Sequence, residues 1–221
     1  MIKTELQWLN NVNGADKIAA EYHQKVLDEF KDNLVAVVMG SAYGGELEYI
    51  ARLWGDKGKV YGFDVFDDLH PKHICADPES FAATCMDYWY GLEEYGRDKM
   101  KLEYQQGLLD GMKMDNVKLI KGLVDKDSCK DIKNIHYAFL DMDMVESMSI
   151  GFEAVKDNMA IGGYLFLHDT QNIPEVGKWY REVVLKDKRY KQIFKGDGQM
   201  LVGLQRVSPI ATSSESRVGE R

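Results

Sequence analysis

Four short, predominantly apolar runs, separated by stretches with helical periodicity, constrain the fold of this 221-residue chain more than any other feature. The runs are LVAVVM (34–39), KVYGFDVF (59–66), HYAFLD (136–141) and YLFLHD (164–169). Continuous rather than alternating apolarity is typical of strands that are buried on both faces, as in a parallel sheet. A glycine-containing turn and a helical stripe at 47–54 follow the first run, so the chain opens with a strand–helix–strand unit.

The alternation of strands and helices continues almost to the end of the chain. VKLI (117–120) reads as a further strand, and helical patterns cover 15–31, 148–159 and about 175–187. RYKQIFK and QMLVGLQRV, joined by GDG at 196–198, instead predict a β-hairpin. We therefore expect an α/β fold with a Rossmann-like, doubly wound sheet of seven strands, mostly parallel and ending in an antiparallel hairpin.

The predicted domain organisation has four parts. A helical segment (1–33) precedes the main domain (34–207), and a polar tail (208–221) is expected to be flexible. An aromatic-rich helical insertion over about 67–113 is too long for a connecting loop. Because it follows the carboxyl end of a strand, where ligands bind in open α/β sheets, it could form a lid or acceptor pocket; an extra packed helical layer is the alternative.

The composition excludes several classes of protein. A net charge of −8 and a pI near 5.2 argue against a general nucleic-acid binder and favour a small-molecule acceptor. No apolar run is long enough to cross a membrane, and the first residues lack a signal-type segment, so a cytoplasmic protein is expected. The three cysteines have no C-x-x-C spacing and are expected to be free thiols. The sequence does not determine the oligomeric state, and a homo-oligomer is one alternative.

The turn after the first strand predicts an adenosine-type ligand. Its sequence, GSAYGGE, lets the backbone approach a ligand at Gly40 and Gly44, and the next helix begins beside it. The G-x-G-x-x-G fingerprint of dinucleotide folds is absent. Asp64 ends the second strand, where a carboxylate can accept both hydroxyls of a ribose. A strand-end cap is the alternative role of this acid.

Two further acids, Asp141 and Asp169, end neighbouring predicted strands and are expected to meet at the same edge of the sheet. Two close carboxylates repel unless a cation lies between them, which a divalent ion such as Mg²⁺ would provide. Asp143, His168 and Thr170 could complete its shell, and His168 suits Mn²⁺ or Fe²⁺ better than Mg²⁺. The alternative is helix capping and cofactor orientation without a metal.

At this point the sequence resembles the class I S-adenosylmethionine-dependent methyltransferases, and most closely the macrocin-type sugar O-methyltransferases. The likeness covers about residues 34–185. It depends on four stretches: YGFDVFDDLHP, DNVKLIKGLVDKDS, LDMDMVES and GGYLFLHDT. Three positions depart from the family pattern: Val38 replaces an acid before the first glycine, Met142 replaces a glycine, and His168 replaces the first of two closing acids.

The resemblance implies a role for each site residue. Gly40, Ser41, Tyr43 and Gly44 are expected to contact the methionine end of the cofactor, and Asp64 and Val65 its ribose. Gly122 and Leu123 are expected to contact the adenine, and Asp141 to make a further cofactor contact. Metal ligation falls to Asp141, His168 and Asp169.

The implied reaction is an in-line attack of an acceptor hydroxyl on the sulfonium methyl group, for which the protein mainly supplies alignment. Asp141 is expected to be a catalytic residue beside the acceptor hydroxyl, and His70 or His73 of the insertion could take the proton of that hydroxyl. His23 and His136 are expected to be structural. Three alternatives stay open. The chain could bind the cofactor without catalysis, could be a nicotinamide oxidoreductase, or could be an iron-dependent hydroxylase, as in a related family that also closes with His-Asp.

Overall fold

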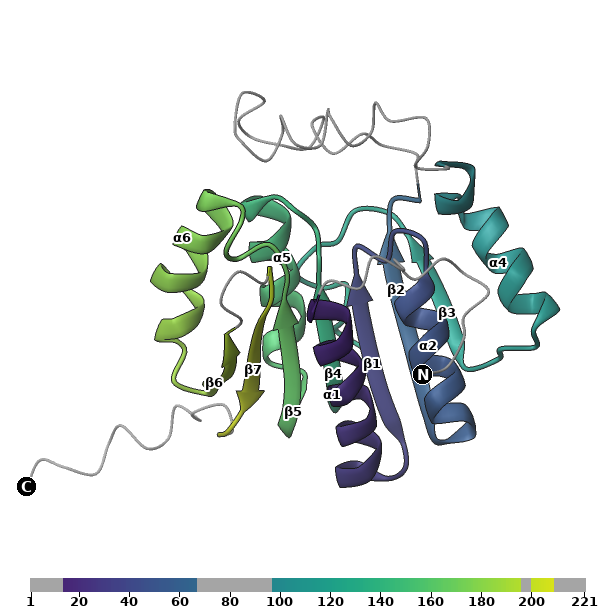
Figure 1. The fold of residues 1–221 in the computed structure, drawn as a ribbon, viewed down its shortest axis with the longest axis horizontal. Coiled ribbons are helices and arrows are strands. Elements are labelled where there is room, and N and C mark those ends of the chain that lie inside the picture. Colours follow the sequence, from purple (N-terminus) through teal and green to yellow (C-terminus); the bar gives the residue numbers. More distant parts are fainter. Residues whose placement is uncertain (1–13, 67–96, 196–199, 209–221) are drawn as a thin grey trace, which may run out of the picture.

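The computed structural model describes residues 14–66, 97–195 and 200–208. Its elements, with η for a 3-10 helix, are α1 (Gly14–Phe30), β1 (Leu34–Met39), α2 (Gly45–Trp54), η1 (Gly55–Lys57), β2 (Gly58–Asp64), η4 (Arg97–Met100), α4 (Leu102–Gly111), β3 (Val117–Lys121), β4 (Ile135–Leu140), α5 (Val145–Lys156), β5 (Met159–Leu167), α6 (Pro174–Glu182), η5 (Val184–Lys186), β6 (Tyr190–Lys195) and β7 (Val202–Arg206) (Figure 1).

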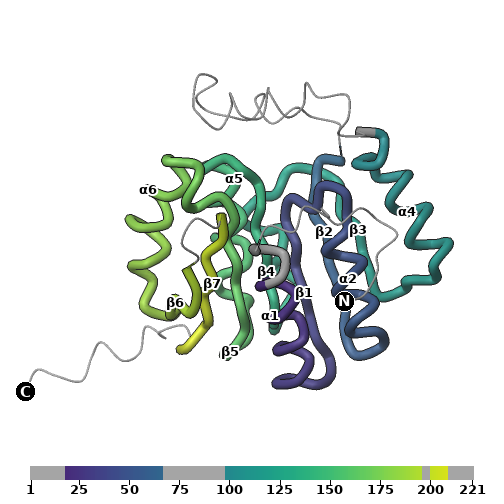
Figure 2. The backbone as a smooth tube through the Cα atoms, in the orientation of Figure 1, coloured from purple at the N-terminus to yellow at the C-terminus, as the bar shows by residue number. Residues whose placement is uncertain are grey.

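The predicted sheet is confirmed: seven strands lie in the order β3-β2-β1-β4-β5-β7-β6. Strands β1 to β5 pair with one another in parallel, whereas β7 runs antiparallel to both β5 and β6. The chain moves outward from β1 to β3 and then returns to pair β4 with β1, a path that can be followed in Figure 2. The strand order therefore reverses between β1 and β4. In doubly wound sheets such a reversal marks the crevice where ligands bind.

Helices cover both faces of the sheet, as continuous apolar strands require (Figure 1). One core contains Val26 of α1 and Leu47 and Trp54 of α2, packed against the sheet. The opposite core contains Phe152 of α5 and Val176 of α6. β4 passes between the two cores, and all six of its residues are buried. The two layers hold the carboxyl ends of the central strands in fixed relative positions.

Several element boundaries differ from their predicted positions. β5 begins at Met159 rather than at 164, because the preceding helix already ends at Lys156. β2 ends at Asp64, since Phe66 has a left-handed backbone with φ of 52°. Within the part of the chain that the structure describes, no helix is long and apolar enough to cross a membrane.

Some predictions fall partly or wholly outside the described residues. These are the first 13 residues of the N-terminal segment, 67–96 of the insertion, the GDG turn at 196–198 and most of the tail, 209–221. The described end of the insertion, 97–113, forms η4 and α4. Cys129 is buried and free, and burial raises the pKa of its thiol to about 12, so it is an unreactive thiol. Cys75 and Cys85 lie outside the described residues.

Candidate active site

The carboxyl ends of β1, β2 and β4 are joined directly by backbone hydrogen bonds at Met39 and Gly40. The Gly40 N–H donates to Phe63 O at 2.9 Å, and the Asp141 N–H donates to Met39 O at 2.9 Å. Gly40 has a φ of 78°, and a Cβ atom there would lie 1.7 Å from the carbonyl oxygen of Asp141. Only glycine combines this conformation with this approach. The glycine that begins the turn therefore brings β1 against β4 at the point where the strand order reverses.

Asp64 ties the end of β2 to the turn after β1. Its carboxylate accepts hydrogen bonds from the N–H groups of Ala42 at 2.8 Å and Phe66 at 2.9 Å. Burial raises the pKa of Asp64, and these backbone donors act in the opposite direction. A carboxylate has about four acceptor positions, so two bonds leave positions for the hydroxyls of a ligand. The geometry is compatible with both predicted roles, a cap and a ribose acceptor.

Gln105 of α4 holds the same turn from the other side, and sequence reasoning missed it. Its side chain is fully buried, and Nε2 donates to Ala42 O at 2.5 Å. Ala42 needs such support because its φ is 46°, in the left-handed region that a non-glycine residue rarely adopts. The contact joins residues 63 positions apart, and no local pattern in the sequence could have indicated it.

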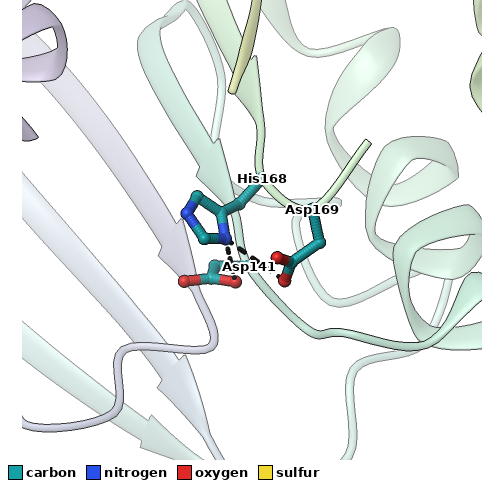
Figure 3. Close-up of side chains that lie close together, drawn as sticks. All are labelled: Asp141, His168 and Asp169. Atoms are coloured by element: carbon teal, nitrogen blue, oxygen red, sulfur yellow. Dashed lines mark ion pairs between the residues drawn. The ribbon is translucent and has the colours of Figure 1, made fainter. Parts of the chain in front are cut away.

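At the ends of β4 and β5, His168 lies between two carboxylates (Figure 3). His168 Nδ1 is 3.0 Å from Asp141 Oδ1 and 3.2 Å from Asp169 Oδ2. Asn172 Nδ2 donates to Asp169 Oδ1 at 2.7 Å and so orients that acid. The predicted convergence of Asp141 and Asp169 is present. Sequence reasoning expected an added cation between them, but the chain places an imidazole there.

Charge coupling within this cluster shifts four pKa values. Burial acts to lower the pKa of His168, but the Asp141 and Asp169 carboxylates overcome it and hold that pKa well above its usual range. Burial raises the pKa of Asp141; burial and then the neighbouring Asp141 and Asp169 charges raise that of Asp143 well above normal. Burial acts to raise the pKa of Asp169 too, but His168 holds it below its usual value. The two carboxylates therefore favour the protonated, cationic form of His168.

Several non-glycine residues at this rim have a left-handed backbone conformation. Eight non-glycine residues have positive φ in the described part of the chain. Four of them lie two or three residues after the ends of β1, β2, β4 and β5, namely Ala42, Phe66, Asp143 and Asp169. Such conformations cost about 1–3 kcal/mol each and cluster at functional sites. The concentration of strain at the carboxyl ends of the strands supports a functional rim there.

Asp141, His168 and Asp169 also fit a divalent metal. Their ligand atoms lie within 4.8 Å of one another. His168 Nδ1 faces both carboxylates, and it can ligate a metal once it is deprotonated. Octahedral ligands at about 2.1 Å from an ion are about 3.0 Å apart, close to the two separations given above. The donor set, one nitrogen and two carboxylates, suits Mn²⁺ or Fe²⁺ better than Mg²⁺.

The remaining predicted site residues lie at different depths. Ser41 and Tyr43 are buried in the turn after β1, and Thr170 is buried after β5. The Gly122 N–H donates to Asp64 O at 2.9 Å, which brings the end of β3 to the rim. Val65 is half-buried, and Leu123 is 58% exposed, so its side chain is accessible beside the rim. His70 and His73 lie outside the described residues.

The two histidines predicted to be structural are both buried. His136 Nδ1 accepts a hydrogen bond from the Val35 N–H at 3.2 Å, which links β4 to β1. Its pKa is lowered by burial. His23 Nε2 lies 3.1 Å from Glu46 Oε1 and so connects α1 to the first turn of α2.

The raised pKa of His168 predicts a fall in stability above neutral pH. A histidine whose folded pKa exceeds its unfolded value near 6.5 stabilises the fold fully below pH 6.5, and this stabilisation is lost as the pH rises through the folded value. His136, with its lowered pKa, acts only below pH 6.5. Urea unfolding between pH 6.5 and 9 should therefore show a falling free energy of unfolding. His168→Gln should flatten this slope, and an equal slope in both proteins would contradict the assignment.

No family model matches the sequence, and a search of curated proteins finds no match. Solved structures do resemble the chain. CalS11, a TDP-rhamnose 3′-O-methyltransferase of calicheamicin biosynthesis, is 17% identical with a TM-score of 0.61, over 89% of this chain and 81% of CalS11. An rRNA methylase from Streptococcus thermophilus is 17% identical with a TM-score of 0.56, over 86% of this chain and 95% of its own.

A third structure carries a cofactor product. SMU.1697c of Streptococcus mutans, in complex with SAH (S-adenosylhomocysteine), is 14% identical with a TM-score of 0.56, over 94% of this chain and 100% of its own. At these identities the likeness establishes the fold alone, which is the Rossmann-like fold of methyltransferases. The acceptors of the neighbours differ, since one acts on a nucleotide sugar and another is named for rRNA.

Proposed function

We propose that the chain is an S-adenosylmethionine-dependent O-methyltransferase that acts on a small organic hydroxyl acceptor. One observation carries the proposal: the glycine turn, Asp64 and the Asp141–His168–Asp169 cluster lie along one rim, where the strand order reverses. The methyltransferase neighbours support the choice of cofactor. The net charge of −8 favours a small acceptor over a nucleic acid.

In this proposal each strand end contacts one part of the cofactor. The turn at Gly40 and Gly44 contacts the methionine end, because it offers backbone without side-chain obstruction. Asp64 accepts the ribose hydroxyls with the lone pairs left by its two backbone donors. Gly122 and Leu123, at the end of β3 next to β2, border the adenine. The sulfonium then lies toward β4, where Asp141 begins the acidic cluster.

The reaction is a displacement at carbon. The acceptor oxygen forms a bond to the methyl carbon as the carbon–sulfur bond breaks, which leaves a methyl ether and S-adenosylhomocysteine. Asp141 takes the hydroxyl proton: it is partly exposed, and its pKa is raised mainly by burial, which makes it a stronger base than an ordinary carboxylate. His168 and Asp169 hold Asp141 in position. The role predicted for His70 or His73 stays a prediction.

Metal assistance is compatible with the same residues. Asp141, His168 and Asp169 would hold the ion, which would supply a Lewis acid that lowers the pKa of the acceptor hydroxyl. The chain's own part is to hold the donor atoms at ligand spacing, with Asn172 fixing the orientation of Asp169. An iron-dependent hydroxylase is less well supported, because its usual triad has two histidines and this cluster has one.

Asp64→Ala tests the cofactor assignment. The variant should bind S-adenosylhomocysteine about 10- to 100-fold more weakly by calorimetry, because a hydrogen bond to a charged group contributes about 1.5–3 kcal/mol. Asp56→Ala removes the same charge from the opposite end of β2 and should leave the affinity unchanged. Wild-type protein that does not bind the product, or equal affinity in wild type and Asp64→Ala, would contradict the ribose role.

Turnover separates an enzyme from a protein that only binds the cofactor. Wild-type protein incubated with labelled S-adenosylmethionine and a panel of sugars, phenols and polyketides should transfer label to at least one hydroxyl. Binding of the cofactor without transfer to any acceptor would favour the non-catalytic alternative.

A further inference from the structure

Glu46, in the first turn of α2, is fixed in place by two side chains from different elements. The hydroxyl of Tyr137 donates to Glu46 Oε1 at 2.8 Å, and His23 Nε2 lies 3.1 Å from the same oxygen. Only 12% of the Glu46 side chain is exposed, and His23 is fully buried. Because α1, α2 and β4 each contribute one of these three residues, the carboxylate has a defined orientation.

The carboxylate of Glu46 lies on the side of the sheet that carries the acidic cluster. Side chains alternate along a strand, so Tyr137 and Asp141 of β4 and its extension point to the same face. Burial is the main cause of the raised pKa of Asp141, and the charge of Glu46 adds to it. Glu46 Oε2 has no hydrogen-bonding partner among the residues that the structure describes. It is therefore available to a ligand at the turn after β1.

The methionine end of the proposed cofactor brings an ammonium group that needs such an acceptor. β1 offers none, because Val38 is apolar and buried. Asp64 is bound to the turn on the β2 side, and Asp141 and Asp169 share His168. Asp143 belongs to the same cluster through its hydrogen bond with Asp169. Glu46, by contrast, lies at the turn after β1, with one oxygen unshared and no lysine or arginine partner among the described residues.

We propose that Glu46 binds the α-ammonium group of S-adenosylmethionine, with Tyr137 and His23 as the residues that position it. This inference rests on the proposed function and assigns the recognition of the cofactor's amino-acid end. A charged hydrogen bond of this kind gives specificity as well as affinity, because a ligand without the ammonium group leaves Glu46 Oε2 without a partner. The competing explanation is purely structural: Glu46 could serve only to join α1, α2 and β4.

The test compares wild type and Glu46→Gln with three probes by calorimetry. The probes are S-adenosylhomocysteine, its analogue without the amino group, and 5′-methylthioadenosine, which lacks the whole amino-acid end. Glutamine keeps an acceptor for the Tyr137 hydroxyl but removes the charge. We expect a loss of about tenfold or more for S-adenosylhomocysteine and a change below about twofold for 5′-methylthioadenosine. Wild type should prefer S-adenosylhomocysteine to the deaminated analogue, and the variant should lose that preference.

Each outcome decides the proposal. A preference for the amino group that persists in Glu46→Gln, or an equal loss for all three probes, would overturn the role of Glu46 and leave the proposed function standing. If wild type binds neither 5′-methylthioadenosine nor S-adenosylhomocysteine, both the role of Glu46 and the proposed function would be overturned. Tyr137→Phe removes the hydrogen bond that the hydroxyl donates to Glu46 and should give a smaller, equally probe-selective loss. Glu103→Gln, on the exposed surface of α4, is the matched control and should change nothing.

Discussion

Asp169→Asn is expected to lower the turnover number about 1000-fold or more while the affinity for S-adenosylhomocysteine changes less than twofold. The acid pairs with His168 and lies beyond the predicted cofactor contacts, so its loss affects the acceptor side of the rim. Asparagine tolerates the left-handed backbone of this position, where φ is 58°, better than most residues. The fold is therefore preserved, while one of the two carboxylates that favour the cationic form of His168, Asp141 and Asp169, disappears.

The experiment measures single-turnover rates with the acceptor found in the panel and product affinity by calorimetry. Asp131→Asn, which neutralises an exposed acid away from the rim, should be fully active. Treatment with a chelator separates two roles of the cluster. If wild type loses activity and regains it with Mn²⁺, the enzyme uses a metal. If the activity is unchanged, His168 supplies the positive charge. Undiminished turnover in Asp169→Asn would remove the cluster from the mechanism.

The fold could be predicted because its signals are local. LVAVVM is continuous and apolar, and β1 has the predicted bounds, 34–39. The hairpin was predicted from two strands with a glycine turn between them, and β6 and β7 pair antiparallel. Where a boundary was wrong, a backbone conformation decided it: Phe66, at the end of the second apolar run, has a positive φ and lies outside β2.

The candidate site could be predicted only in part, since strand ends are visible in a sequence and side-chain partners are not. Asp64, Asp141 and Asp169 end apolar runs, and parallel strands place their carboxyl ends at one edge. Glu46 and Gln105 lie in helices, where an acid or an amide is ordinary. Their contacts, Glu46 with Tyr137 and Gln105 with Ala42, join positions 91 and 63 residues apart. Only the three-dimensional packing reveals them.

The position of His168 illustrates the same limit in electrostatic terms. In the sequence it replaces the first of the two acids that the family pattern has at this position. In the structure its ring lies between Asp141 and Asp169 and relieves their repulsion from within the chain. The cluster can thus hold either a proton on Nδ1 or a cation bound by it, because both occupy the same space between the carboxylates. Acidic pH should favour the proton, since a metal ligand must be deprotonated.

Gly40→Ala is the second change with a large expected effect, because it acts on the joint between β1 and β4. The added Cβ would lie 1.7 Å from the Asp141 carbonyl oxygen, a contact with backbone that no rotamer change can relieve, and φ is 78°. We expect a loss of about 3 kcal/mol or more in the free energy of unfolding, hence a fall in Tm of about 6–12 °C. Binding of S-adenosylhomocysteine should be lost as well, since the turn must move away from Asp141.

Gly107→Ala provides the matched control for that experiment. Gly107 lies inside α4 with no atom within 4 Å of an added Cβ, so alanine should stabilise the helix by up to about 1 kcal/mol and leave binding intact. Thermal unfolding and calorimetry on both variants measure the difference. If Gly40→Ala folded with wild-type Tm and wild-type product affinity, the close approach of β1 to β4 would be dispensable. The rim formed by the turn, Asp64 and the acidic cluster would then lose its structural basis, because Gly40 is the residue at which those strand ends meet.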